Sequence, residues 1–196
     1  MSTIVETLRG WALRDVVEDH RSRAGVGVLA FVLATSFGAQ VAVPLPWTPV
    51  PMTLQPLFVI LAGAVMGPRL GATAMAIYLA IGAAGAPVFS NGGFGIPWLL
   101  GPTGGYLIAT PFAAFLTGTI ARPRSTSLTV LAGLTLGVAA MYLGGVSQLL
   151  MLTGQDLQTV VGFGVVPFVT GDALKILIAW VALRGVRPQI FGREGA

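Results

Sequence analysis

Apolar segments of about twenty residues, separated by short loops, dominate this chain of 196 residues. The first runs from Gly25 to Val43 and contains no charged residue. A helix of about this length crosses the hydrocarbon core of a bilayer, which is roughly 30 Å thick. Only 9% of all residues are charged, whereas soluble domains carry about 25%. The sequence therefore predicts an all-α integral membrane protein whose main solvent is membrane lipid.

Five further apolar segments bring the prediction to six transmembrane helices. They cover approximately residues 52–67, 70–84, 105–121, 128–152 and 160–183. The second and third are separated by Gly67-Pro68-Arg69, where a proline and a charge interrupt the helix. A five-helix alternative would fuse these two segments and bury Arg69. We expect a membrane domain over residues 24–185, between an N-terminal segment (1–23) and a C-terminal tail (186–196).

The distribution of cations predicts the orientation of these helices. Ten of the eleven Lys and Arg residues lie in the N-terminal segment, at Arg69, between the fourth and fifth helices, or in the C-terminal tail. Six helices place all of these positions on one side, which the positive-inside rule makes cytoplasmic. We therefore expect both termini in the cytoplasm of a multi-pass protein of the bacterial cytoplasmic membrane. Residues 1–23 form either an interfacial helix or a solvated tail.

The rarity of reactive side chains excludes several functional classes. The chain has no cysteine and one histidine, His20, which rules out disulfides and argues against a metal centre or another cofactor. Its cations are scattered rather than clustered, so nucleic acid is not an expected partner. An intramembrane enzyme is disfavoured, since the apolar segments lack His, Cys and a second carboxylate for acid–base work. We predict that the protein is not an enzyme.

Two charges stand inside the last apolar segment, Asp172 and Lys175. Placing a charge in a bilayer is costly, and intramembrane ionisable residues usually mark functional sites. Residues three apart lie on one helix face, so each charge can compensate the other. The pair therefore predicts a binding site, with a purely structural salt bridge as the alternative.

Two loops without charged residues are predicted to face this pair from outside the cell. Residues 44–51 contain four prolines and Trp47, and they form a stiff loop at the membrane boundary. Residues 85–104 are rich in Gly and Pro and contain Asn91, as expected of a lid or re-entrant loop over a cavity. Such a cavity suits a small amphipathic molecule. Tyr106 and Gln55 are secondary candidate contacts.

The first helix carries small residues at every fourth position, Ala30, Ala34 and Gly38. Such a stripe permits two helices to approach closely. Most stripes of this kind serve internal packing.

Four motifs together resemble the BioY family, the biotin-binding substrate (S) components of energy-coupling factor (ECF) transporters. They are Pro44–Gln55 (PLPWTPVPMTLQ), Leu61–Gly71 (LAGAVMGPRLG), Leu100–Tyr106 (LGPTGGY) and Pro167–Lys175 (PFVTGDALK). The resemblance covers about residues 25–185. It implies a six-helix S-component fold that captures biotin at the outer face, with ligands at Asn91, Asp172 and Lys175.

The resemblance also implies partner subunits. A transmembrane T component would dock on Ala30 and Ala34, and two cytoplasmic ATPases would power uptake. This agrees with the lack of a phosphate-binding Gly-x-x-x-x-Gly-Lys-Ser/Thr loop in the chain. The alternative is a self-sufficient secondary carrier, in which Asp172 would bind a coupling proton or sodium ion.

Overall fold

The computed structural model describes residues 20–122 and 125–191. Most of the predicted N-terminal segment lies outside these ranges. Among the described residues, helix α2 already begins at His20, and the last helix continues to Phe191, beyond both predicted ends of the membrane domain.

Four long helices form the body of the molecule: α2 (His20–Gln40), α3 (Gln55–Ala83), α7 (Ser127–Thr153) and α9 (Val166–Phe191). All four contain stretches long and apolar enough to cross a membrane. The shorter elements are β1 (Ala42–Val43), β2 (Met52–Thr53), the 3-10 turn η1 (Ser90–Gly92), and α4 (Gly95–Leu99), α5 (Gly104–Ile108), α6 (Thr110–Ile120) and α8 (Leu157–Gly164). The prediction of an all-helical membrane protein is confirmed, since the two strands are only a pair of two-residue segments.

Helix α3 contains both the second and the third predicted segments, and it is broken where the sequence predicted. Gly67 has φ 80° and ψ 177°, and Pro68 follows it. Glycine can adopt this backbone conformation because glycine has no Cβ atom. The second arm then turns back across the first, so that Gly71 lies against Gly63.

Three predicted helix boundaries are wrong. The second helix begins at Gln55 rather than Met52, because Met52 and Thr53 form strand β2. The first helix ends at Gln40 rather than Val43, because Ala42 and Val43 pair with Thr53 and Met52 in an antiparallel hairpin around the proline-rich loop. The sixth was expected from Val160, but residues 157–164 form the separate helix α8. Val165 leaves the helical conformation there, and Pro167 has no N–H with which to continue a helix from upstream.

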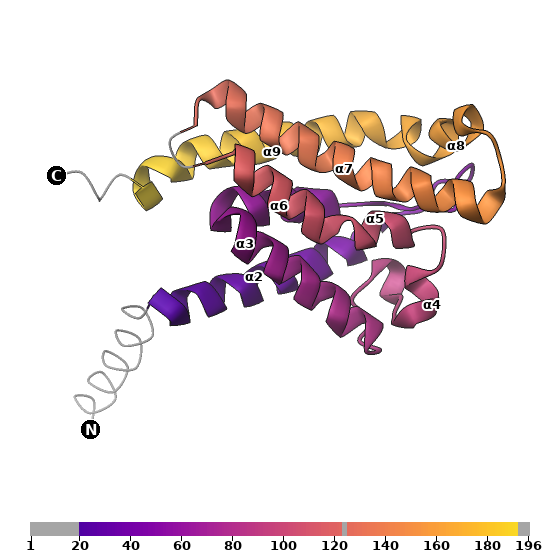
Figure 1. Cartoon of the computed structure of the whole chain (residues 1–196), viewed down its shortest axis with the longest axis horizontal. Helices are drawn as coiled ribbons and strands as arrows, with labels where there is room; N and C mark the ends of the chain where they lie inside the picture. The colour runs from indigo at the N-terminus through magenta and orange to yellow at the C-terminus, as the bar shows by residue number, and fades with distance from the viewer. Residues whose placement is uncertain (1–19, 123–124, 192–196) are drawn as a thin grey trace.

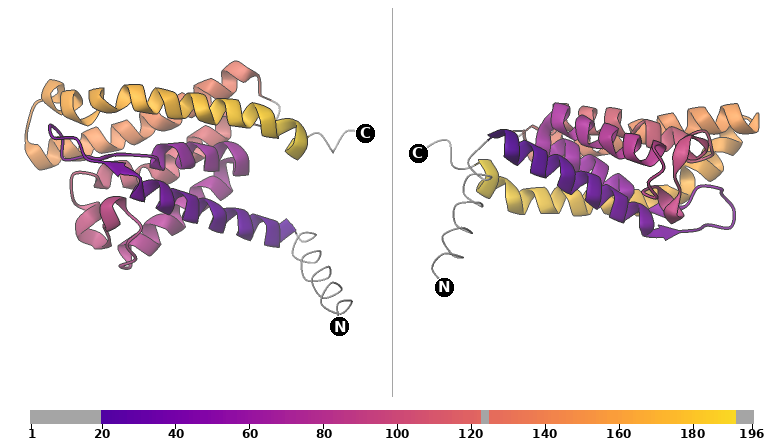
Figure 2. Two further views of the ribbon diagram at one scale, coloured as in Figure 1. Left: turned by 180° about the vertical axis from the view of Figure 1, so that it is seen from behind. Right: turned by 90° about the horizontal axis from the view of Figure 1, so that it is seen from below.

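Most of the loops and short elements gather at one end of the molecule. The start of α2, the start of α7 and the end of α9 lie at the opposite end from α4, α8 and the proline-rich hairpin (Figure 1). The views from behind and from below show the same separation (Figure 2). We call the end with the hairpin the loop end.

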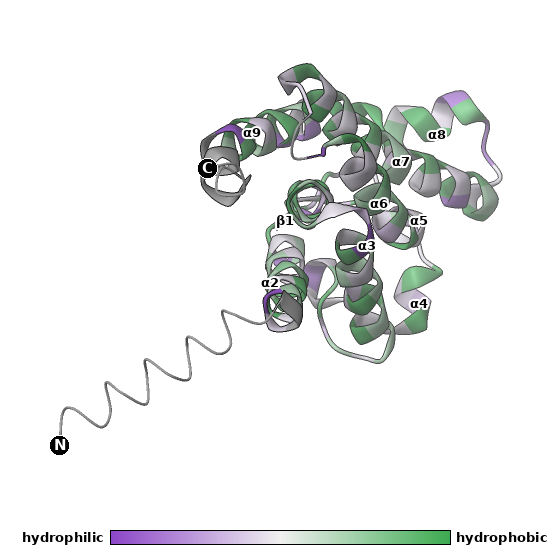
Figure 3. Cartoon of the chain, turned by 60° about the vertical axis from the view of Figure 1, so that its left-hand side comes forward, coloured by the Kyte–Doolittle hydropathy of each residue, from purple (hydrophilic) through white to green (hydrophobic). Residues whose placement is uncertain are grey.

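The outside of the bundle is apolar, and glycines allow close contact between helices inside it. Leu33, Leu143 and Leu174 are at least 58% exposed, and hydrophobic residues predominate along the helices (Figure 3). Exposed apolar side chains suit a protein solvated by lipid, where close packing rather than hydrophobic burial joins the helices. Helix α6 packs against α3 and α7, and Gly118 of α6 lies against Gly63 and the break at Gly67 and Pro68.

Substitution at Gly63 tests this close packing. A Cβ at position 63 would collide with the carbonyl oxygen of Ala114 on α6, and backbone atoms cannot move aside as a flexible side chain can. We expect Gly63→Ala to lower the free energy of unfolding by about 1–3 kcal/mol, measured by thermal melting in detergent. Gly162→Ala on α8 is the control, since a Cβ there meets no atom within 4 Å. Equal melting temperatures for the two variants would contradict the proposed contact.

Candidate substrate-binding site

A buried ion pair lies near the start of α9. Lys175 Nζ donates to Asp172 Oδ1 at 2.6 Å, and the two residues are 6% and 4% exposed. Helix α9 begins at Val166, with Pro167 in its first turn, so the pair lies within the first three turns at the loop end. A salt bridge between the two residues is thus present, and its second, ligand-binding role remains a prediction.

Tyr142 of α7, which the sequence analysis did not single out, completes the environment of the carboxylate. Its hydroxyl donates to Asp172 Oδ2 at 2.5 Å. Both carboxylate oxygens therefore have a protein donor, which fixes the plane and the position of the group. A tyrosine in the middle of an apolar helix was the available signal, but its register relative to Asp172 depends on how α7 and α9 pack.

The pair opens into a small inner cavity of about 60 Å³. Four of the five predicted ligand-binding residues line it, namely Gln55, Tyr106, Asp172 and Lys175. The remaining wall is mostly apolar and is made by Val50, Pro51, Thr53, Pro56, Ser90, Thr103, Leu107, Val138, Met141, Tyr142 and Phe168. Residues from the hairpin, α3, α5, α7 and α9 thus meet around one charged pair.

Gln55 belongs to a chain of hydrogen bonds that joins this cavity to the Gly-rich loop. Its Nε2 donates to Tyr78 Oη at 2.8 Å, and Tyr78 Oη donates to the carbonyl of Val88 at 3.0 Å. Its Oε1 accepts from Thr53 Oγ1 at 3.2 Å. The Gln55 amide is therefore held in one orientation at the cavity wall.

Tyr106 contributes its ring to the cavity, while its hydroxyl is engaged elsewhere. Tyr106 Oη donates to the carbonyl oxygen of Gly164 at 2.6 Å. This bond ties α5 to the end of α8, and Gly145 of α7 leaves room for the ring. Tyr106 therefore contributes the apolar surface of its ring to the cavity wall.

Asn91 does not line the inner cavity. It lies in an outer cavity of about 260 Å³, together with Pro49, Pro51, Pro97, Trp98, Gly101, Pro102 and Thr103. Pro51 and Thr103 line both cavities, so the two spaces adjoin. Asn91 has φ 54°, in the left-handed region that asparagine tolerates better than most residues. The turn η1 therefore holds it at the surface.

The Gly-rich loop is anchored rather than loose, by two glutamines that the sequence analysis did not identify. Gln40 at the end of α2 donates to the carbonyl of Phe89 at 2.9 Å and accepts from Gly92 N at 3.1 Å. Gln148 of α7 donates to the carbonyls of Leu99 and Gly101 at 2.9 and 2.7 Å. The fully buried Phe89 ring adds an apolar anchor. The predicted lid thus has fixed attachment points on two helices.

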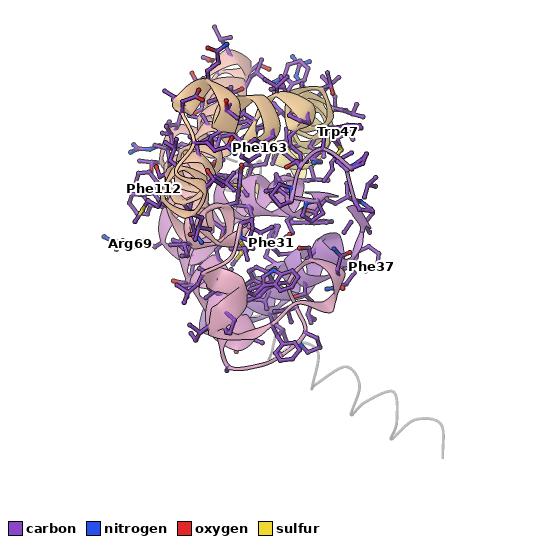
Figure 4. All side chains as sticks on the ribbon, turned by 90° about the vertical axis from the view of Figure 1, so that its right-hand side faces the viewer. Phe31, Phe37, Trp47, Arg69, Phe112 and Phe163 are labelled. Atoms are coloured by element: carbon purple, nitrogen blue, oxygen red, sulfur yellow. The ribbon has the colours of Figure 1, made fainter. Side chains whose placement is uncertain are left out.

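The small-residue stripe of α2 divides between two roles. Gly38 packs internally, since a Cβ there would collide with the ring of Phe58. Ala34 is half-buried, and Ala30 is exposed beside the exposed Leu29 and Leu33. Phe37 continues this outward face and lies at the rim in the end-on view, as does Trp47 of the hairpin loop (Figure 4). Ala30 and Ala34 are thus placed on an outer surface of α2.

Comparison with known proteins identifies the family. The family model described as "BioY family" matches residues 12–191. The chain belongs to the BioY family. It is 44% identical to the "Probable biotin transporter BioY" of Pyrococcus horikoshii over 78% of this chain and 88% of that one. It is 39% identical to the "Biotin transporter BioY" of Thermotoga maritima over 75% and 86% of the two chains.

A solved structure shares the fold. It is the S-component for biotin from an ECF-type ABC transporter, and it superposes with a TM-score of 0.80 at 26% identity. The match covers 87% of this chain and 93% of that one. The chain is therefore an S-component by fold, in a family of multi-pass membrane transporters rather than of enzymes.

Removal of one charge or of both tests the burial of the ion pair. Lys175→Met leaves the Asp172 carboxylate without its cation, and Asp172→Asn leaves the Lys175 ammonium without its anion. Either single change should cost about 3–5 kcal/mol of stability, because an uncompensated buried charge remains. The double variant should recover most of this loss in thermal melting. If the losses of the two single variants simply add, the pair is not coupled as the structure shows.

Proposed function

We propose that this protein captures biotin at the loop end and delivers it as the substrate-binding component of an ATP-driven ECF transporter. The observation that carries the proposal is the buried Asp172–Lys175 pair at the base of a mostly apolar cavity in a BioY-family chain. Biotin is a small amphipathic molecule, with a polar ureido ring, an apolar thioether ring and a carboxylate tail. The inner cavity offers partners for the ureido ring in particular.

The hydrogen-bonding capacity of the pair matches a ureido group. A carboxylate has about four acceptor positions, and Lys175 and Tyr142 occupy two of those on Asp172. The open positions can accept from one of the two ureido N–H groups, because the N–H bonds of a cyclic urea diverge on either side of its carbonyl. The Lys175 ammonium has three N–H donors and uses one on Asp172, so it can also donate to the ureido carbonyl.

We propose six membrane crossings with both termini in the cytoplasm. The break at Gly67 divides α3 into two arms, and α5 and α6 follow one another through Ala109, which gives six helical segments with the remaining long helices. The loops at the loop end contain no Lys or Arg. The opposite end carries Arg23, Arg122 and Arg184 near the helix ends, as the positive-inside rule requires of the cytoplasmic side.

We further propose that a T component docks on α2 around Ala30 and Ala34 and that cytoplasmic ATPases drive uptake. The outward position of the exposed Ala30 and the half-buried Ala34 supports this, since small residues let a partner helix approach closely. The secondary-carrier alternative would need Asp172 to exchange a coupling ion. Asp172 already accepts hydrogen bonds from Lys175 and Tyr142, which favours a ligand-binding role over exchange of a coupling ion.

Titration of the detergent-purified protein with biotin, after removal of co-purified ligand, tests the site. Wild type should bind one biotin tightly. Asp172→Asn should weaken binding at least about a hundredfold, because charged hydrogen bonds contribute about 1.5–3 kcal/mol each. Asp156→Asn is the matched control, since Asp156 is exposed at the start of α8 and lines neither cavity. A well-folded wild type that does not bind biotin would refute the proposed ligand.

Substitution on α2 tests the docking surface. Ala34→Leu should leave biotin binding unchanged and reduce ATP-driven uptake at least about tenfold in liposomes containing the complete transporter, because the larger side chain separates the helices. Ala132→Leu, at an exposed alanine of α7, should transport normally. If Ala34→Leu transports normally, the small-residue stripe serves only internal packing. ATP-independent uptake by this protein without partner subunits would instead favour the secondary carrier.

A further inference from the structure

The inner cavity is too small to hold a complete ligand. Pockets for small molecules usually measure roughly 300–1,000 Å³, whereas the space beside Asp172 and Lys175 measures about 60 Å³. It has room for one end of a ring-and-chain molecule. The remainder of the ligand must extend into adjoining space.

Two larger spaces adjoin the inner cavity, and they differ in access. An apolar groove of about 450 Å³ lies between α7 and α9 and shares Val138, Tyr142 and Asp172 with the inner cavity. The hydrogen bond from Tyr142 to Asp172 separates this groove from the inner cavity. On the cytoplasmic side, the fully buried Ile60, Leu134 and Ala179 belong to one packed core cluster. Of the two spaces, the outer cavity, reached past Pro51 and Thr103, is therefore the one that can receive the rest of the ligand.

The outer cavity has no charged lining. Its walls are four prolines, the ring of Trp98, Gly101, the Asn91 carboxamide and the Thr103 hydroxyl. The two loops that surround it, residues 44–52 and 85–104, contain no charged residue in the sequence. Within the described part of the chain, the side chains of Asn91 and Thr103 make no hydrogen bond, so both are available to a ligand. A ligand end placed here meets neutral hydrogen-bonding groups and no cation.

We infer that the outer cavity is a second subsite that accepts the carboxyl end of the ligand in neutral as well as charged form. This inference rests on the proposed binding of biotin with its ureido ring at Asp172 and Lys175. A carboxylate held by neutral groups beside exposed Pro97 and Pro102 keeps part of its hydration. Its conversion to an ester or amide therefore removes little binding energy. The substrate class of this protein extends to carboxyl-substituted biotin conjugates.

Competition titrations on the wild-type protein separate the two ends of the ligand. Biotin methyl ester and an N-alkyl biotinamide should each bind within about tenfold of biotin. 2-Iminobiotin, whose cyclic guanidinium brings a cation against Lys175, should bind at least about a hundredfold more weakly. Loss of biotin binding itself would refute the proposed function. Tight biotin binding with a hundredfold or greater loss for the ester and the amide would refute only the second subsite.

A cation introduced into the outer cavity should make the protein bind biotin, with its carboxylate, more tightly than the neutral methyl ester. Pro102 is exposed on the cavity wall, so Pro102→Arg should fold and should raise the affinity for biotin relative to its methyl ester about two- to fivefold, as an exposed ion pair does. Pro46→Arg is the matched control, at an exposed proline that lines neither cavity. The ratio of the affinity for biotin to the affinity for its methyl ester is the quantity measured. If this ratio is unchanged in Pro102→Arg, or changes equally in both variants, the outer cavity does not hold the carboxyl end.

Discussion

The buried ion pair of Asp172 and Lys175 requires the surrounding structure to compensate two charges in an apolar bundle. Two charges in an apolar bundle are tolerated when each compensates the other and when their remaining hydrogen-bonding positions are occupied. The 2.6 Å contact between them meets the first requirement, and the hydroxyl of Tyr142 meets part of the second. The positions left open are those that a ureido group would occupy. The proposed affinity for biotin and the cost of burying the pair thus have one physical origin.

Close helix packing without large side chains determines where the cavity can form. Gly63, Gly71 and Gly118 bring the two arms of α3 and helix α6 into backbone contact, which leaves no space in that part of the bundle. The space opens instead at the loop end, where the hairpin, α5 and the start of α9 meet around Tyr106 and Gln55. In lipid, where apolar surface does not drive helices together, such contacts are a main source of cohesion.

The loops over the site are held by side-chain-to-backbone hydrogen bonds. Gln40 and Gln148 bind backbone groups of the Gly-rich loop from α2 and α7 respectively, and Phe89 is buried beneath it. A loop that is anchored at separate points can present two adjoining cavities with different linings. The inner one is charged and the outer one is neutral, which is the basis for distinguishing the two ends of the ligand.

The sequence by itself determined the membrane class, the break at Gly67, the extent of α7 and the pairing of Asp172 with Lys175. These features depend on local composition: apolar length, proline and glycine geometry, and the cost of a charge in lipid. The tertiary structure decided what depends on helices distant in sequence. It brought Tyr142 to Asp172 across 30 residues, separated Asn91 from the inner cavity, and divided α8 from α9. A hydrogen bond between two helices depends on their relative rotation and depth, which no local pattern of residues specifies.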